Sequence, residues 1–132
     1  FSIIFYNLRI KVMTDPNGKG GMMPAIAGNK VRVRNQLQTV KPDGGTDHML
    51  ALREALNLKP EVIFFLTDAD LMSNNDVNEI LGIAAGSRIQ AVECGRGSDL
   101  GTQTPLRRLA TTTGGTYRYI DVTTFPRNAQ GY

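Results

Sequence analysis

The chain has 132 residues, a size that fits one domain with a sizeable hydrophobic core. Its hydrophobic fraction of 41% and charged fraction of 20% are ordinary for a globular protein, and no stretch approaches the roughly 20 apolar residues of a membrane span. The net charge of +3 is mild, and the basic residues do not form a patch with interleaved aromatics, which argues against a nucleic-acid partner.

The cysteine and histidine content narrows the possible chemistry. Cys94 is the single cysteine, so an internal disulfide is excluded, and no cysteine–histidine cluster has zinc spacing. We expect Cys94 to be a small buried or half-buried thiol at a strand end. His48 is the single histidine. We expect it on the surface in the first turn of a helix, with no nucleophile beside it, so a histidine-based mechanism is disfavoured.

Two short strands are predicted at the start of the chain. Residues 1–6 are mostly apolar, residues 9–13 alternate between basic and apolar, and Asn7 marks a tight turn between them. This arrangement predicts an antiparallel hairpin. Residues 15–21 form a glycine-rich loop without Walker spacing, which indicates a surface loop and not a phosphate cradle. Because the chain opens inside an apolar strand and not with Met, we expect its N-terminal part to be missing, which leaves its localisation open.

The next segment is ambiguous between a strand and a helix. Residues 30–34 alternate as in a strand. Four apolar residues instead share one helical face, namely Ile26, Val33, Leu37 and Val40. We predict a helix from about residue 29 to residue 40, followed by Pro42, which cannot continue it.

A tight loop at residues 43–47 opens the second predicted helix. The inward stripe has three- and four-residue spacing and consists of Met49, Leu52, Ala55 and Leu56. Thr46 or Asp47 can cap the free amides at the helix start. An acidic side chain in this place is also favoured by the helix dipole.

An apolar run at residues 62–66 is the centre of the predicted fold. It is about strand length, rich in β-branched and aromatic residues, and preceded by Pro60. This pattern predicts a strand buried on both faces inside a parallel sheet. Thr67, Asp68 and Asp70 follow it, so acidic groups lie at the carboxyl end of the strand, where open α/β sheets bind ligands. A hard cation held by oxygen atoms is the ligand that such groups favour.

The remaining chain alternates between helices and strands. Ser73–Asp76 resembles a capping box, residues 88–94 read as a strand, and Thr104–Pro105 is typical of a helix start. Residues 116–121 form a final strand with both tyrosines on one face, and residues 122–132 are a loose polar tail. We therefore predict an α/β fold. It is a doubly wound, mostly parallel sheet with helices on both faces, preceded by the hairpin.

Several segments together resemble the von Willebrand factor type A domain family. The loop Gly44-Gly45-Thr46-Asp47 opens a helix, and the apolar strand ends in Leu66-Thr67-Asp68. The segments 89–95 and 106–117 are similar to the last strands and helix of that family, and residues 1–7 to its second strand. The resemblance covers nearly all of residues 1–132 and implies one Rossmann-like domain.

The resemblance also implies a metal-ion-dependent adhesion site. Thr46 would be the ligand from the second loop and Asp68 the acid from the third, with Asp47 and Asp70 as possible outer-shell groups. The cofactor would be Mg²⁺ or another divalent cation. The family's Asp-x-Ser-x-Ser motif does not occur in this chain. We expect that motif, and the first central strand that carries it, to lie outside the chain, so the domain is incomplete at its N-terminus and holds part of a site.

Three functions follow as hypotheses. The first is a binding module, not an enzyme, that contacts a protein partner through a divalent cation and an acidic side chain of the partner. The second is a metal-free structural domain of a cell-envelope or membrane-anchored protein, with any membrane contact made by segments not in this chain. The third is a Mg²⁺-dependent hydrolase that uses Asp68 and Asp70, although we find no nucleophile or base for it. Fold analogy alone does not decide between them.

Overall fold

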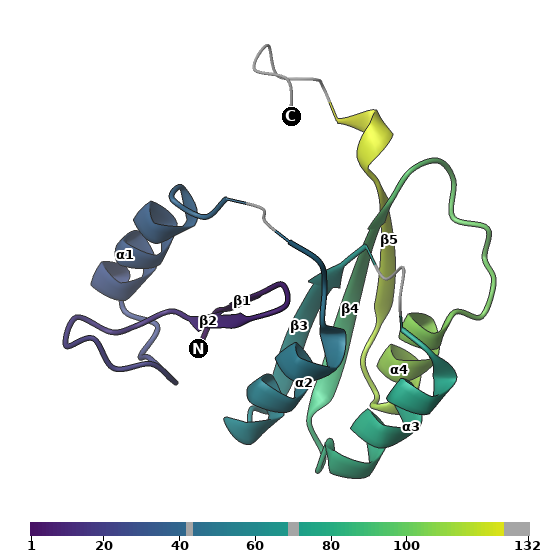
Figure 1. The fold of residues 1–132 in the computed structure, drawn as a ribbon, viewed down its shortest axis with the longest axis horizontal. Helices are drawn as coiled ribbons and strands as arrows, with labels where there is room; N and C mark the ends of the chain where they lie inside the picture. Colours follow the sequence, from purple (N-terminus) through teal and green to yellow (C-terminus); the bar gives the residue numbers. More distant parts are fainter. Residues whose placement is uncertain (42–43, 69–71, 126–132) are drawn as a thin grey trace. The chain divides into compact units, whose positions relative to one another are not determined.

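A computed structural model of the chain describes residues 1–41, 44–68 and 72–125. The chain is divided into two compact units, one formed by residues 1–58 and the other by residues 59–132. The fold is α/β, with a two-stranded antiparallel hairpin in the first unit and a three-stranded parallel sheet with helices in the second (Figure 1). The predicted combination of a hairpin and a parallel sheet is therefore confirmed.

The first unit holds the hairpin and two helices. Strands β1 (Ile4–Tyr6) and β2 (Ile10–Val12) pair antiparallel, with Ile4 opposite Val12. Helix α1 (Ala27–Leu37) follows, then α2 (His48–Asn57), which packs against β1. The core of the hairpin and α1 consists of Met13, Met23 and Val33, with Phe1, Ile3 and Phe5 packed against it.

Helix α1 is present as predicted, but its first and last residues and its buried face differ from the prediction. It starts two residues earlier and ends three residues earlier than the predicted helix at 29–40. Val33 is buried as expected, whereas Ile26 and Leu37 are exposed. Asn29 is buried instead, and its side-chain amide donates a hydrogen bond of 2.9 Å to the Pro24 carbonyl. The predicted apolar face is thus wrong for Ile26 and Leu37.

Helix α2 begins as the sequence indicates. Asp47 is the N-cap residue, and its carboxylate accepts a hydrogen bond of 2.9 Å from the Leu50 amide. His48, which we expected on the surface, is only 5% exposed, so that prediction is wrong. Its Nδ1 lies 3.2 Å from the Tyr6 hydroxyl, within hydrogen-bonding distance, and the two rings meet edge to face. The polar partner offsets the cost of burying the imidazole.

The second unit is built on strands β3 (Val62–Thr67), β4 (Arg88–Gly95) and β5 (Tyr117–Asp121), in that spatial order. All neighbours pair in parallel, with Val62 beside Arg88 and Ala91 beside Tyr117. Helices α3 (Asn74–Ile83) and α4 (Pro105–Thr112) connect them, and a 3₁₀ turn η1 (Val122–Thr124) follows β5. Part of the predicted loose tail, residues 126–132, lies outside the described residues.

Helices α3 and α4 cover one face of this sheet. The connections β3–α3–β4 and β4–α4–β5 run in the same direction across the sheet, and right-handed crossovers then place both helices on the same side. Helix α4 packs on β4 and β5, and α3 packs on α4 (Figure 1). The buried residues of this layer are Ile63, Phe65, Val77, Ile80, Ile89, Ala91, Leu106, Leu109 and Ala110. The predicted helix starts are confirmed, since Ser73 and Asp76 form a capping box and Thr104 caps α4 ahead of Pro105.

Strand β3 is not buried on both faces, so this prediction is wrong. Ile63, Phe65 and Thr67 are buried, whereas Phe64 is 72% and Leu66 60% exposed. The reason is that β3 is an outer strand of the order β3–β4–β5 and the unit's two helices lie on the other face. A continuous apolar run therefore has the burial pattern of a half-covered strand.

Candidate functional site

The candidate site lies at the carboxyl edge of the parallel sheet, where β3, β4 and β5 all end. Ligands of open α/β sheets bind at this edge. Asp68 follows β3 directly and is exposed. Its side chain makes no hydrogen bond or ion pair among the residues that the structure describes. Asp68 therefore has both the position and the free carboxylate oxygens that a cation ligand needs.

The other carboxylates near this edge are already bonded within the protein. The Asp121 carboxylate accepts from the Thr123 hydroxyl at 2.6 Å and from the Gly97 amide at 3.0 Å. These hydrogen bonds, first of all the one from the Thr123 side chain, lower the pKa of Asp121. Asp121 thus fastens the start of the β4–α4 loop to the end of β5.

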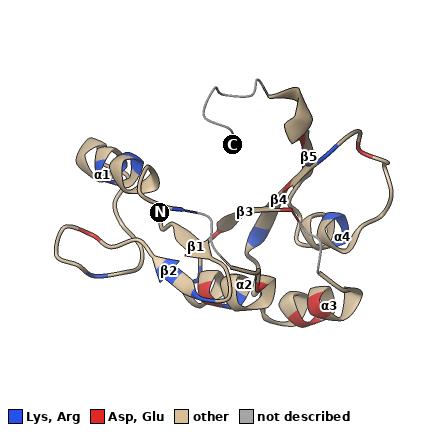
Figure 2. Cartoon of the chain, turned by 45° about the horizontal axis from the view of Figure 1, so that its top comes forward, with Lys and Arg blue, Asp and Glu red and all other residues tan. Residues whose placement is uncertain are grey.

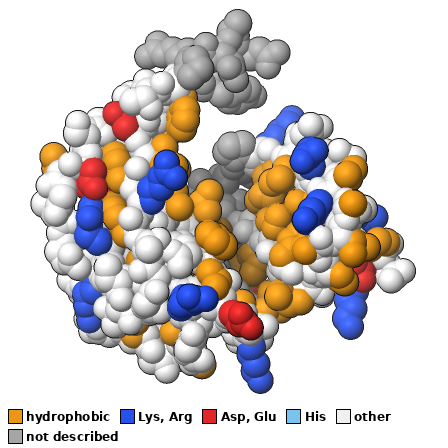
Figure 3. Space-filling view, turned by 180° about the vertical axis from the view of Figure 1, so that it is seen from behind, with side chains coloured by type: hydrophobic (Ala, Val, Ile, Leu, Met, Phe, Trp, Pro, Cys, Tyr) orange, Lys and Arg blue, Asp and Glu red, His pale blue; other side chains and the backbone are white. Residues whose placement is uncertain are grey.

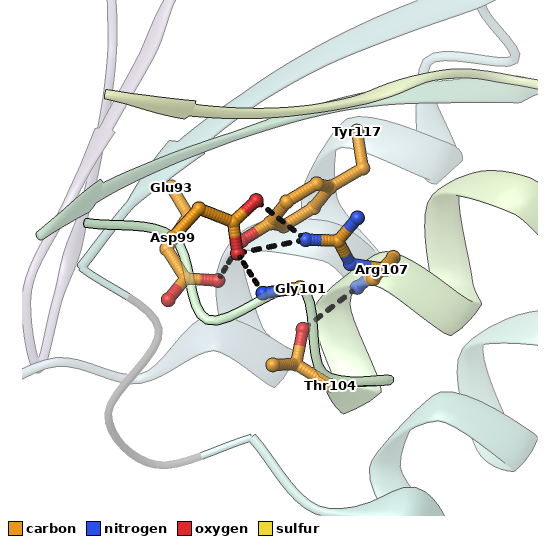
Figure 4. A network of polar contacts seen from close by, with 6 residues as sticks. All are labelled: Glu93, Asp99, Gly101, Thr104, Arg107 and Tyr117. Atoms are coloured by element: carbon orange, nitrogen blue, oxygen red, sulfur yellow. Dashed lines mark hydrogen bonds and ion pairs between the residues drawn. The ribbon is translucent and has the colours of Figure 1, made fainter. Parts of the chain in front are cut away.

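Asp99 fastens the same loop to helix α4. Its two carboxylate oxygens accept from Nη2 of Arg107 at 3.0 and 2.7 Å, and one of them also accepts from the Gly101 amide at 2.9 Å (Figure 4). The hydrogen bond that the Gly101 amide donates, and then the one from the guanidinium of Arg107, lower the pKa of Asp99. Arg107 itself is positioned by the helix cap, since its amide donates to the Thr104 hydroxyl at 3.2 Å.

The guanidinium of Arg107 also stacks over Tyr117, with 4.1 Å between its central carbon and the ring centroid. The Tyr117 hydroxyl donates to Oε2 of Glu93 at 2.8 Å. Burial of the hydroxyl, followed by its bond to Glu93, raises the pKa of Tyr117 to about 12. Four side chains from β4, the loop, α4 and β5 thus form one network that holds the loop against the sheet.

Sequence reasoning missed this network. Glu93, Asp99, Arg107 and Tyr117 lie on four different segments. The pairing of β4 with β5 and the packing of α4 on these strands bring them together. The one local signal was the cap, because Thr104 followed by Pro105 fixes Arg107 in the first turn of α4. Cys94 is a free, half-buried thiol at the end of β4, as predicted.

The residues that the family resemblance implies as metal ligands fall in different parts of the structure. Thr46 is half-buried in the loop before α2, in the first unit, next to the capping residue Asp47. Asp68 belongs to the second unit. Asp70 lies outside the described residues. Within the described ranges, no group of three or more His, Cys, Asp or Glu residues is placed to hold a metal ion.

The loop that carries Thr46 is attached to the hairpin of its own unit. The Asp47 amide donates to the Asn7 carbonyl at 2.9 Å. Gly44 adopts a left-handed backbone conformation with φ of 76°, which glycine accepts without strain. The Thr46 hydroxyl retains lone pairs for a ligand, because Asp47 and not Thr46 provides the helix cap.

A scan against models of known protein families gives no match, and a search of curated proteins finds no relative. Lys and Arg residues are distributed over several elements of both units (Figure 2). Among the described residues, no helix is long and apolar enough to cross a membrane.

Proposed function

We propose that this chain is a protein-interaction module similar to von Willebrand factor type A domains, whose sheet edge binds a divalent cation. The observation that carries the proposal is the exposed Asp68 directly after a parallel β-strand. The family resemblance implies Thr46 as a further ligand and Asp47 and Asp70 as possible outer-shell groups. Further oxygen ligands come from water or another segment, since Mg²⁺ requires about six and usually retains several waters.

The proposed mechanism of binding is ligand exchange at the cation. Asp68 would hold the cation at the sheet edge, and the bound cation would offer a position to an acidic side chain of the protein partner, whose negative charge would favour binding there. The neighbouring carboxylates of Asp99, Glu93 and Asp121 bond to Arg107, Tyr117 and Thr123, respectively. Among the described residues at the carboxyl edge of the second unit, Asp68 is therefore the acid that is available to a cation. The proposed role is binding and not catalysis.

The experiment is a titration of the chain with Mg²⁺ and Mn²⁺, followed by thermal unfolding. A ligand that binds only the folded state at 100 times its Kd raises the free energy of unfolding by about 2.7 kcal/mol. We expect stabilisation by the metal, reversal by a chelator, and loss of both effects in Asp68→Ala. Glu61→Ala is the matched control, because Glu61 is an exposed acid at the opposite end of the same strand. Equal responses of the two variants would contradict the proposal.

A second candidate is a metal-free interaction domain. The observation that favours it is the exposure of Phe64 and Leu66, two large apolar side chains on one face of the sheet. Monomeric proteins rarely leave large contiguous apolar patches open unless they serve binding. Partner binding that survives both chelation and Asp68→Ala would select this candidate over the first.

A further inference from the structure

The face of the sheet opposite α3 and α4, called the open face below, carries a band of apolar side chains. Phe64 and Leu66 are its most exposed members. The parallel register places Leu66 beside Val92 and Cys94 beside Ile120, so the band runs across all three strands. Figure 3, which views the chain from behind, shows hydrophobic side chains with basic ones next to them.

The charged residues that β4 and β5 place on the open face are arginines. Arg88 pairs in register with Val62, and Arg118 pairs with Val92, so both arginines share the face of the apolar band, and both are exposed. The acidic residues of these strands, Glu93 and Asp121, occupy the alternate positions, and Glu93 bonds to Tyr117 beside α4. The sheet thus separates its charges, with acids on the helix side and arginines on the open side.

This pattern selects one kind of occupant. A half-covered sheet is completed by a second layer, and an amphipathic helix is the common one. Positive charge at the border of the band is complementary to acidic residues that flank the helix's apolar stripe. A second copy of the chain related by a two-fold axis would bring Arg88 and Arg118 onto a surface with the same positive charges, which is unfavourable.

We propose that the open face of β3, β4 and β5 docks an amphipathic helix of a partner protein. The apolar side of that helix packs on Phe64 and Leu66, and its flanking acids pair with Arg88 and Arg118. This surface differs from the proposed cation site at the carboxyl edge, and its binding needs no metal. The two proposals therefore stand or fall separately.

The test uses the full chain and a fluorescent helical peptide of about 18 residues, close to five turns. Leucines in the peptide repeat at helical spacing with glutamates beside them, and a matched peptide has lysines in place of the glutamates. We expect the glutamate peptide to bind more tightly by fluorescence anisotropy. The double variant Phe64→Ser/Leu66→Ser should weaken its binding at least about 10-fold, as removal of central interface anchors does.

Charge reversal sharpens the test. The variant Arg88→Glu/Arg118→Glu should prefer the lysine peptide, whereas Lys30→Glu/Arg34→Glu, with the same charge change on exposed residues of α1, should bind as the unaltered chain does. Circular dichroism establishes that each variant is folded. Chelation should leave the peptide affinity unchanged.

Three results would overturn the proposal. One is a folded chain that binds neither peptide, and another is equal affinity for the glutamate and lysine peptides. The third is a dimer, detected by analytical ultracentrifugation, that dissociates in Phe64→Ser/Leu66→Ser, because the face would then bind a second copy.

Discussion

The two faces of the parallel sheet in the second unit differ although the same strands form both. Phe64 and Phe65 are neighbours in β3, yet Phe65 is 4% exposed and Phe64 72% exposed. Helices α3 and α4 bury one side of each strand, and the open face keeps its apolar residues accessible. The covered face thus supplies stability to this unit, and the open face is the surface on which we propose that a partner binds.

The largest expected effect is the difference in the free energy of unfolding between truncating Phe65 and truncating Phe64. Phe65→Ala should lower the free energy of unfolding by roughly 3–5 kcal/mol, because it removes a buried ring and leaves a cavity. Phe64→Ala should change it by about 0.5 kcal/mol or less, as expected for an exposed side chain. Denaturant unfolding of both variants measures the difference. Similar losses for both would show that the open face is covered in solution.

A smaller effect is expected where the chain passes close to β4. A Cβ atom added to Gly115 would lie 2.0 Å from the Ile89 carbonyl oxygen, so Gly115→Ala forces the backbone to shift and should cost roughly 1–3 kcal/mol. Gly82→Ala is the control, because Gly82 lies in α3 with open space around its Cα. That variant should be more stable by about 0.5–1 kcal/mol. Urea midpoints that fall equally in both variants would contradict this packing.

The smallest effect concerns the Tyr117 hydroxyl at the carboxyl edge. Its pKa of about 12 in the folded chain exceeds the ordinary value of 10.0, so the folded state holds the proton more tightly than the unfolded state. The resulting stabilisation is complete below pH 10 and is lost as the pH rises towards 12. Tyr117→Phe should cost about 1 kcal/mol at neutral pH, the usual value of one hydrogen bond.

The same variant should lose part of this alkaline pH dependence. Tyr119→Phe is the comparison, since Tyr119 shares the strand and the face and burial also raises its pKa, but it forms no hydrogen bond with Glu93. An unchanged alkaline slope in Tyr117→Phe, measured by thermal unfolding between pH 9 and 12, would contradict the role of this hydroxyl.

Local signals predicted the order and type of the elements well. The caps at Ser73 and Thr104 and the alternation of helices and strands are properties of short stretches, and the structure confirms them. The burial of Phe64 and His48 was mispredicted, because it depends on which helices cover a face and on a partner, Tyr6, that is 42 positions away. Sequence patterning reports that a residue is apolar or polar and does not report what lies against it.

The candidate site shows the same limit. Asp68 could be chosen from the sequence because an acid after an apolar strand is a local signal. The network of Glu93, Asp99, Arg107 and Tyr117 could not, since it depends on how β4, β5 and α4 pack together. Thr46 as a ligand rests on the family resemblance and not on a local signal.

The central claim is that Asp68 binds a divalent cation at the carboxyl edge of the sheet. The measurement is paramagnetic broadening by Mn²⁺ of the assigned amide signals of the isotope-labelled chain. The account predicts that the amide of residue 68 broadens at low Mn²⁺ concentration, that Mg²⁺ competes, and that Asp68→Ala abolishes the broadening whereas Glu61→Ala does not. An Asp68→Ala variant whose signals broaden like those of the unaltered chain would contradict the claim.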